Sequence, residues 1–211
     1  MIENIRWLGH GGFVIQGTQS IFIDPWRVIR SAFHADIILI THDHYDHCST
    51  ADIAKLRGPQ TIIIGNELVA EKIEGTTVIR PWQSMSFDRI SIKAIPAYAP
   101  DGVTHKKEEG GLGFIISVNY YDIYYTGDTK IIPEMQRVSP DIIILPIDNH
   151  DTLSVDEAVQ VIDNLSPRWV IPCNWGSTSE GASELDAQDF KAKIGGRAEV
   201  ILPRVDSDSV M

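Results

Sequence analysis

Short apolar runs separated by polar and turn-forming residues dominate the first half of the chain. Four runs rich in Ile, Val, Leu and Phe are bounded by Gly, Pro, Asn or Asp, a pattern that is typical of β-strands. They cover residues 2–8, 12–17, 20–24 and 37–40. Because Gly17-Thr18-Gln19 supplies turn residues between two of these runs, we expect the chain to begin as a meander.

Helical signals appear between the later strands. Ser49 can cap a helix that ends near Gly58-Pro59, and Ser154 with Glu157 forms a capping-box pattern before helical apolar spacing. Two further helices are expected over residues 67–73 and 186–194. The remaining strands are expected at 61–64, 78–79, 85–87, 90–95, 112–118, 122–126, 142–145, 169–172 and 198–202.

Strands that come first as a meander and later alternate with helices indicate an α/β or α+β fold. Two mixed sheets packed face to face and covered by helices agree with this order. No linker divides the chain, so we expect a single domain over residues 1–211. Residues 96–111 show no periodicity and are rich in Gly, Pro and charge, which favours an active-site or binding loop.

Composition and charge exclude several classes of protein. The net charge of −11 and the scattered basic residues argue against a nucleic-acid partner. No apolar stretch reaches the roughly eighteen residues that a membrane span needs, and the start lacks a basic region before an apolar core. We therefore expect a cytoplasmic protein without a membrane partner. Cys48 and Cys173 are too few for a disulfide framework and are expected to be reduced.

The densest chemical signal lies directly after the apolar run 37–40. The segment His42-Asp43-His44-Tyr45-Asp46-His47 places three imidazoles and two carboxylates in six consecutive positions. Such groups would repel or protonate one another if they converged without a cation. The segment therefore predicts one or two divalent metal ions, with zinc favoured and manganese or iron as alternatives. The tight spacing disfavours a solvated loop with a chance excess of His.

This segment resembles the His-x-His-x-Asp-His signature of the metallo-β-lactamase superfamily, which also follows a buried strand. Farther along, residues 124–129 are similar to a later superfamily strand that ends in Gly-Asp and supplies a bridging carboxylate, here Asp128. Residues 7–13 and 23–26 resemble the branch that contains the ascorbate-6-phosphate lactonase and uncharacterised metal-dependent hydrolases. The resemblance implies a four-layer αββα sandwich with the metal site at one edge, where strand ends meet.

The resemblance also implies a ligand set, from which this chain departs at two positions. The implied metal ligands are His42, His44, Asp46, His47 and Asp128. Where relatives place a third imidazole this chain has Ala99, which cannot coordinate, and where they place a final imidazole it has Asn174, whose amide oxygen is a weaker donor to zinc. His105, in the long loop, is the candidate that could replace the missing ligand. A solvent-exposed loop histidine is the alternative.

Other polar residues are candidates for supporting roles. His10, flanked by glycines, could contact the substrate or orient a ligand, and His150 is a weaker candidate for the same role. Asp24 is expected to orient a ligand histidine by accepting its second N–H. Asn174 is also expected to contact the substrate or to orient a ligand.

The chemistry implied by these residues is hydrolysis of a small ester, lactone or phosphoester by a metal-bound hydroxide, with Asp46 and Asp128 as catalytic residues. The expected partner is a small-molecule substrate, and a homo-oligomer is left open. Ala99 and Asn174 motivate an alternative, a degenerate member that binds a ligand and turns over little. A nuclease of the same superfamily is a third interpretation, disfavoured by the acidic charge.

Overall fold

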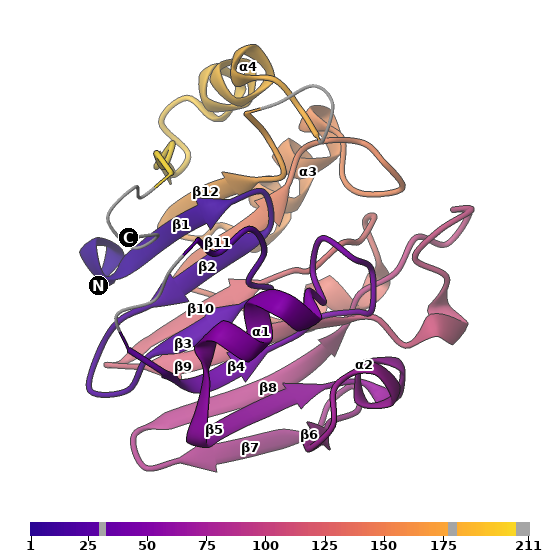
Figure 1. The fold of residues 1–211 in the computed structure, drawn as a ribbon. Coiled ribbons are helices and arrows are strands. Elements are labelled where there is room, and N and C mark those ends of the chain that lie inside the picture. Colours follow the sequence, from indigo (N-terminus) through magenta and orange to yellow (C-terminus); the bar gives the residue numbers. More distant parts are fainter. Residues whose placement is uncertain (30–32, 177–180, 206–211) are drawn as a thin grey trace. The chain divides into compact units, whose positions relative to one another are not determined.

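The computed structural model describes residues 1–29, 33–176 and 181–205. The chain divides into two compact units. The N-terminal unit comprises residues 1–79 with the C-terminal residues from Pro203 onward, and the C-terminal unit comprises Arg80–Leu202. Each unit contains one sheet and its own helices (Figure 1). The two mixed sheets with helices confirm the predicted α/β class, whereas a single domain over residues 1–211 stays a prediction.

The N-terminal unit is a six-stranded sheet in sequential order. Its first three strands are antiparallel neighbours, and its last four run parallel, with helices in the last two connections. The strands are β1 (Ile5–Gly9), β2 (Gly12–Ile15), β3 (Ile21–Ile23), β4 (Ala35–Leu39), β5 (Arg57–Gly65) and β6 (Thr76–Val78). The helices are the 3-10 helix η1 (Ile2–Asn4), α1 (Thr50–Leu56) and α2 (Glu67–Lys72).

Side-chain caps define where α1 and α2 begin. The Ser49 hydroxyl accepts a hydrogen bond from the Asp52 N–H, as the sequence predicted, and the Asn66 side chain does the same for Val69. Apolar residues of both helices pack on one face of the sheet in a buried cluster that includes Phe22, Ile38 and Ile53. This packing anchors the segments that flank the histidine-rich loop.

The C-terminal unit is a seven-stranded sheet with order β13-β12-β11-β10-β9-β8-β7. Strands β7 to β10 are antiparallel neighbours, and β10 to β13 are parallel. The strands are β7 (Ser84–Phe87), β8 (Ile90–Pro96), β9 (Leu112–Val118), β10 (Tyr121–Tyr125), β11 (Ile142–Pro146), β12 (Trp169–Cys173) and β13 (Glu199–Val200). The helices are η2 (Lys107–Glu109), η3 (Pro133–Arg137), α3 (Val155–Leu165) and α4 (Glu184–Ile194).

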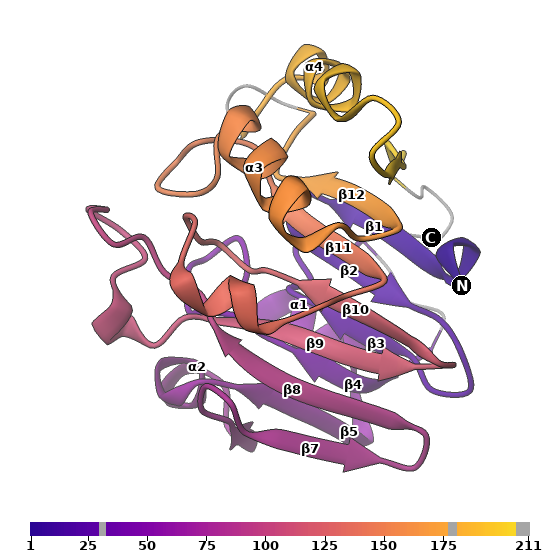
Figure 2. The same ribbon diagram turned by 180° about the vertical axis from the view of Figure 1, so that it is seen from behind.

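Helices α3 and α4 lie next to each other on the side of the sheet near β11 and β12 (Figure 2). The predicted capping box of α3 is present, since Ser154 and Glu157 each accept a hydrogen bond from the other's backbone N–H. The apolar side of α3 includes Val161 and Ile162, which join Phe190 of α4 in the buried core of this unit. The sheet is therefore covered along its parallel half.

Several predicted boundaries were inaccurate, including that of the first strand, whose expected residues 2–4 form the 3-10 helix η1. Helix α4 was expected to start at Asp186 but begins at Glu184. Ser183 is its cap, and Asp186 is the capping-box partner three residues after that cap. Strand β5 begins directly after α1, at Arg57. Strand β13 spans only Glu199–Val200. The short 3-10 helices were not predicted, because a single turn leaves little periodic signal.

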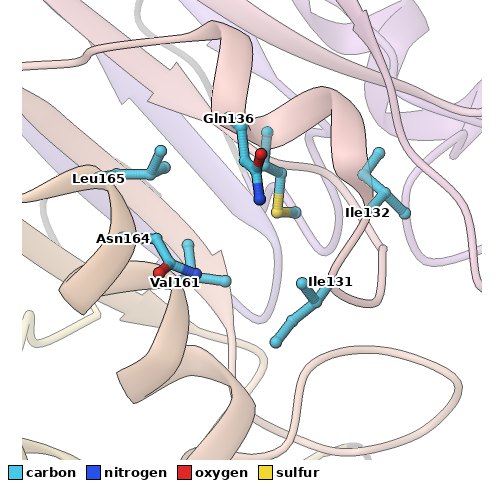
Figure 3. Close-up of a pocket in the computed structure, with 7 residues that line it drawn as sticks. Ile131, Ile132, Gln136, Val161, Asn164 and Leu165 are labelled. Atoms are coloured by element: carbon cyan, nitrogen blue, oxygen red, sulfur yellow. The ribbon is translucent and has the colours of Figure 1, made fainter.

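A small cavity of about 20 Å³ lies between η3 and α3, near Ile132 and Val161 (Figure 3). Such a volume holds about one water molecule and excludes a substrate. Among the residues that the structure describes, no helix has the length and apolar character needed to cross a bilayer.

Candidate metal centre

The N-terminal unit gathers its chemical residues at one edge of the sheet. Strands β1 and β3 are both antiparallel to β2, and β4 is parallel to β3, so these three strands end at the same edge. His10 follows β1, Asp24 follows β3, and the segment beginning at Thr41 follows β4. Carboxyl ends of neighbouring parallel strands are the usual place for a site in such sheets.

A buried chain of hydrogen bonds links Asp24 to His42 through Thr41. The Thr41 hydroxyl donates to Asp24 Oδ2 at 2.6 Å and lies 2.8 Å from His42 Nδ1, and the Thr41 N–H donates to Asp24 Oδ1 at 2.8 Å. Because the single hydroxyl proton goes to the carboxylate, the His42 Nδ1–H must be the donor to the hydroxyl oxygen. His42 therefore presents the lone pair of its Nε2.

The same carboxylate fixes His47. His47 Nδ1 lies 2.8 Å from Asp24 Oδ2, and both side chains are fully buried. The hydrogen bond expected for Asp24 is thus present, and it leaves His47 Nε2 as the ring's lone-pair nitrogen. A single acidic residue sets the tautomer of two histidines, one directly and one through a hydroxyl.

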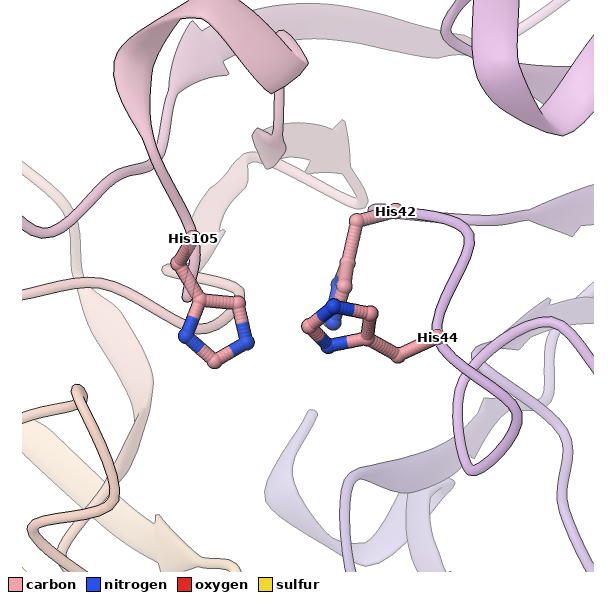
Figure 4. Close-up of side chains that lie close together, drawn as sticks. All are labelled: His42, His44 and His105. Carbon is pink, nitrogen blue, oxygen red and sulfur yellow. The ribbon is translucent and has the colours of Figure 1, made fainter. Parts of the chain in front are cut away.

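The loop tightens after Tyr45. The His44 carbonyl accepts the N–H groups of His47 and Cys48 at 3.1 and 2.7 Å. The ring centroid of His42 lies 4.6 Å from that of His44 and 4.2 Å from that of His47. Figure 4 shows the rings of His42 and His44 next to each other on this loop.

His10 and Asp46 form a second group with His47. One potential ligand atom from each of the three lies within 4.8 Å of the others. His10 Nε2 is 3.1 Å from Asp46 Oδ2, and the edge of Trp26 packs on the His10 ring at 5.4 Å between centroids. Burial acts to raise the pKa of Asp46, but the hydrogen bond with His10 and the electrostatic effect of the neighbouring His47 and His10 rings outweigh it and lower that pKa.

The C-terminal unit repeats this arrangement at the edge of its own sheet. Strands β8, β10, β11 and β12 point the same way, because β8 and β10 are both antiparallel to β9 and the others are parallel to β10. The loop of residues 97–111, Asp128, Asp148 and Asn174 follow these four strands. Residues spread over about eighty positions are thereby collected at one edge.

The long loop brings His105 back to the position of Ala99. The Ala99 N–H donates to the His105 carbonyl at 2.8 Å, and the Gly102 N–H donates to the Ala99 carbonyl at 3.2 Å. Asp151 holds the tip of the loop by accepting the N–H groups of Val103 and Thr104 at 2.7 and 2.8 Å. The imidazole at 105 therefore arises beside the alanine that cannot coordinate.

Asp128 lies at the centre of the polar residues at this edge of the C-terminal sheet. Its Oδ2 lies 3.5 Å from His105 Nε2, and its Oδ1 accepts a hydrogen bond from Asn174 Nδ2 at 3.1 Å. Asn174 is 1% exposed, and its Oδ1 is buried without a hydrogen-bond partner among the residues that the structure describes. The loop histidine is thus close to Asp128, which disfavours the alternative of a freely solvated side chain.

Asp148 was missed by the sequence analysis. Its carboxylate accepts the Thr152 hydroxyl at 2.6 Å and lies 3.1 Å from His150 Nδ1, while the His150 side chain is 69% exposed. Burial, followed by the negative charge of Asp128, raises the pKa of Asp148. The signal that could have found it is its position after the apolar run 142–147, which matches that of Asp128 after β10.

The donors around His42 and His47 in the N-terminal unit (the N-terminal set) and those around Asp128 in the C-terminal unit (the C-terminal set) each fit a divalent metal ion. In the N-terminal set, His42 and His47 hold their protons on Nδ1, the tautomer that a ligand bound through Nε2 requires. In the C-terminal set the Asp128 carboxylate lies beside a buried amide oxygen, that of Asn174, for which the described part of the chain offers no hydrogen-bond partner. Nitrogen and oxygen donors of these kinds suit zinc, manganese and iron.

A larger cleft lies elsewhere in the C-terminal unit. It has a volume of about 620 Å³ and is lined by the hairpin residues 117–122 with Arg89 and Asp141. The hairpin turn is at the edge opposite to Asp128, because β10 begins there and ends at the candidate site. None of the candidate site residues lines this cleft.

Comparison with known proteins finds similarity along nearly the whole chain. A family model described as a beta-lactamase superfamily domain matches residues 4–174. A UPF0173 metal-dependent hydrolase of Thermococcus onnurineus is 31% identical, with 94% of this chain and 95% of the relative covered. Another, of Thermoplasma volcanium, is 30% identical, with 98% of each chain covered.

Solved structures show the same fold. A candidate metal-dependent hydrolase of Parabacteroides distasonis has a TM-score of 0.84 at 27% identity, covering 96% of this chain and 93% of that one. Igni18, a metallo hydrolase of Ignicoccus hospitalis, has a TM-score of 0.79 at 23% identity, covering 96% and 95%. A specific likeness to the ascorbate-6-phosphate lactonase stays a prediction.

Proposed function

Because the chain belongs to the metallo-β-lactamase superfamily and is a metal-dependent hydrolase, we propose that it cleaves a small ester, lactone or phosphoester. The observation that carries this proposal is the pair of tautomer-fixed histidines, His42 and His47, controlled by the buried Asp24. Such a network serves no packing need. Its effect is to aim two imidazole lone pairs away from the groups that hold the rings.

The proposed metal ligands are those of the two donor sets. The N-terminal unit offers His42, His44, Asp46 and His47, and the C-terminal unit offers His105 and Asp128. The number of ions, one or two per chain, and their identity as zinc are part of the proposal. Its support is the chemistry of the donors and the superfamily membership.

A divalent ion held by these donors would supply a nucleophilic water near neutral pH and would polarise the oxygen of the attacked carbonyl or phosphoryl group. The residues of the chain supply positioning and proton transfer. Asp46 has a lowered pKa, so its carboxylate stays ionised at neutral pH and can accept a hydrogen bond from a water molecule and orient it. His10 holds Asp46 Oδ2 by a hydrogen bond and thereby orients that carboxylate. Asp128 is the corresponding carboxylate of the C-terminal set.

A ligand-binding protein with little turnover is the second candidate, and Ala99 is the observation that favours it. Alanine leaves one expected coordination position without a donor, which lowers metal affinity unless His105 replaces it. The hydrogen bond from Ala99 to His105 supports the replacement and hence the hydrolase. The nuclease interpretation has no support beyond the superfamily and is opposed by the net charge of −11.

The substrate is expected to be a small molecule. A cytoplasmic location, the absence of a nucleic-acid partner and any homo-oligomer stay predictions from the sequence.

The proposal is tested by metal content and turnover together. Protein purified without chelator is expected to hold one or two metal equivalents and to hydrolyse at least one of a nitrophenyl ester, a simple lactone and a nitrophenyl phosphodiester. His44→Ala is expected to lose most of the metal and activity. His34→Ala, an exposed histidine of the same unit, is the matched control. Retention of metal and activity in His44→Ala contradicts the ligand assignment, whereas full metal with no turnover favours the ligand-binding protein.

A further inference from the structure

Asn174 combines deep burial with an amide oxygen that lacks a hydrogen-bond partner among the described residues. It follows β12 at the edge that also carries Asp128, and only 1% of it is exposed. Its Nδ2 donates to Asp128 Oδ1 at 3.1 Å, while its Oδ1 makes no hydrogen bond to any described residue. Leaving a buried acceptor unsatisfied costs free energy, so a site that keeps one has a use for it.

The backbone around Asn174 is clamped, so the orientation of its side chain is imposed. Asn174 has a φ of +57°, in the left-handed region that asparagine tolerates better than most residues. The Ala182 N–H donates to the Asn174 carbonyl at 2.8 Å, and the Gly176 N–H donates to the Ala182 carbonyl at 2.8 Å. A side chain on Gly181 would lie 2.2 Å from that same Asn174 carbonyl oxygen, so the close approach requires glycine there.

The hydrogen bond to Asp128 limits where the free oxygen can point. Since Nδ2 and Oδ1 share one planar amide, Oδ1 lies near the carboxylate that Nδ2 contacts. Two oxygen acceptors close together, with His105 Nε2 3.5 Å from the same carboxylate, attract a cation and repel an anion.

We infer that Asn174 Oδ1 is a direct donor to the metal ion held by Asp128, and that this oxygen shifts the preference of the site from zinc toward manganese or ferrous iron. The inference rests on the proposed metal-dependent function and adds a ligand to it. Imidazole favours zinc, whereas carboxylate and amide oxygens favour harder cations such as Mn²⁺. This chain carries an amide where an imidazole would have favoured zinc.

The alternative is that Asn174 acts only through its Nδ2, by holding Asp128 in place. The isosteric variant Asn174→Asp separates the two roles, because it keeps an oxygen at the Oδ1 position but removes the N–H donor. If Asn174 is a donor, Asn174→Asp retains manganese. If it only positions Asp128, Asn174→Asp loses manganese as Asn174→Ala does.

The experiment is equilibrium dialysis of the full chain against chelator-buffered Mn²⁺ and Zn²⁺, with both metals measured in the same sample. Asn174→His is expected to raise the zinc-to-manganese ratio about 10- to 100-fold, the scale on which changes around a ligand alter metal affinity. Asn174→Ala is expected to lose manganese by about tenfold or more. Asn119→Ala is the matched control, since Asn119 has a φ of +52° at the hairpin turn on the opposite edge.

Two results would overturn the inference while leaving the proposed function intact. One is an unchanged zinc-to-manganese ratio in Asn174→His and Asn174→Ala, with both still folded by circular dichroism and His44→Ala depleted of metal. The other is an Asn174→Asp variant that loses manganese like Asn174→Ala. A wild-type chain that binds neither metal above the level of His44→Ala would instead refute the proposed function.

Discussion

Replacing Thr41 by valine is expected to weaken metal binding although Thr41 is not a proposed ligand. The Thr41 hydroxyl donates to Asp24 and accepts from His42. It therefore connects the carboxylate to the imidazole and fixes the position and the tautomer of that ring. Valine has nearly the same volume and leaves the Thr41 N–H in its hydrogen bond to Asp24. The substitution therefore removes mainly the two hydroxyl hydrogen bonds that connect Asp24 to His42.

The magnitude follows from what each partner loses. Asp24 loses one hydrogen bond of 2.6 Å but keeps those from the Thr41 N–H and from His47. Hydrogen bonds to charged groups contribute about 1.5–3 kcal/mol, and the buried His42 Nδ1–H adds about 1–3 kcal/mol if it finds no other acceptor. Because the two effects overlap, we expect the free energy of unfolding of the metal-free protein to fall by about 2–4 kcal/mol. Metal affinity is expected to fall about 10- to 100-fold.

The assay has two parts and a matched control. Urea unfolding of chelator-treated protein measures stability, and titration with Zn²⁺ or Mn²⁺ against a competing chelator measures affinity. Thr61→Val is the control, because the Thr61 hydroxyl also makes two hydrogen bonds, to Ala35 and Gly58, but touches no histidine. Thr61→Val should lower the free energy of unfolding and leave the metal affinity unchanged. Wild-type metal affinity in Thr41→Val would refute the role assigned to the Asp24–Thr41–His42 chain.

Three further predictions concern the C-terminal unit. Gly102→Ala places a methyl group 2.6 Å from the Ala99 Cβ, so we expect a shifted loop and a loss of about 1–3 kcal/mol in urea unfolding. Tyr124→Phe removes a buried hydroxyl that lacks a hydrogen-bond partner among the described residues, so thermal unfolding should show a gain of about 1 kcal/mol. Hydrogen bonds from Ser183 lower the pKa of Asp186, so its stabilising effect is present above the unfolded pKa of about 3.9 and is lost as the pH falls through the lower folded value. Asp186→Asn should therefore cost about 0.5 kcal/mol at pH 7, reduced by solvent screening, and almost nothing near pH 2, as measured by denaturation at each pH.

Local patterns predicted those parts of the fold that local forces determine. The capping box of α3 and the cap of α1 were found because Ser and Glu or Asp three residues apart satisfy the same backbone donors in any helix. The strands at 112–118 and 122–126 were found as separate apolar runs, and the two residues of the turn between them, Asn119 and Tyr120, have positive φ of +52° and +65°. The predicted start of α4 was inaccurate because Asp186 is a residue type common at helix starts but serves here as the capping-box partner of Ser183.

The candidate site was predictable only where its residues are close in sequence. The histidine-rich loop was evident because its members lie within six positions of one another. The contact of His10 with Asp46 depends on β1 and β4 ending at the same edge of a sheet, which no short-range pattern encodes. Asp148 was missed for the same reason, since it becomes a neighbour of Asp128 only through the parallel pairing of β10 with β11.

The pair Ala99 and His105 shows how a missing ligand and a loop histidine can depend on each other. Gly102 lies so close to Ala99 that even a methyl group on Gly102 would meet the Ala99 Cβ, and the turn between them is held by a hydrogen bond of 3.2 Å. A histidine at position 99 would need the space that this turn occupies, so the turn and a ligand at 99 exclude each other. The same turn carries the chain back so that His105 hydrogen-bonds to Ala99 and its imidazole lies 3.5 Å from Asp128. The alanine is therefore part of the arrangement that positions His105, and it does not by itself indicate a lost site.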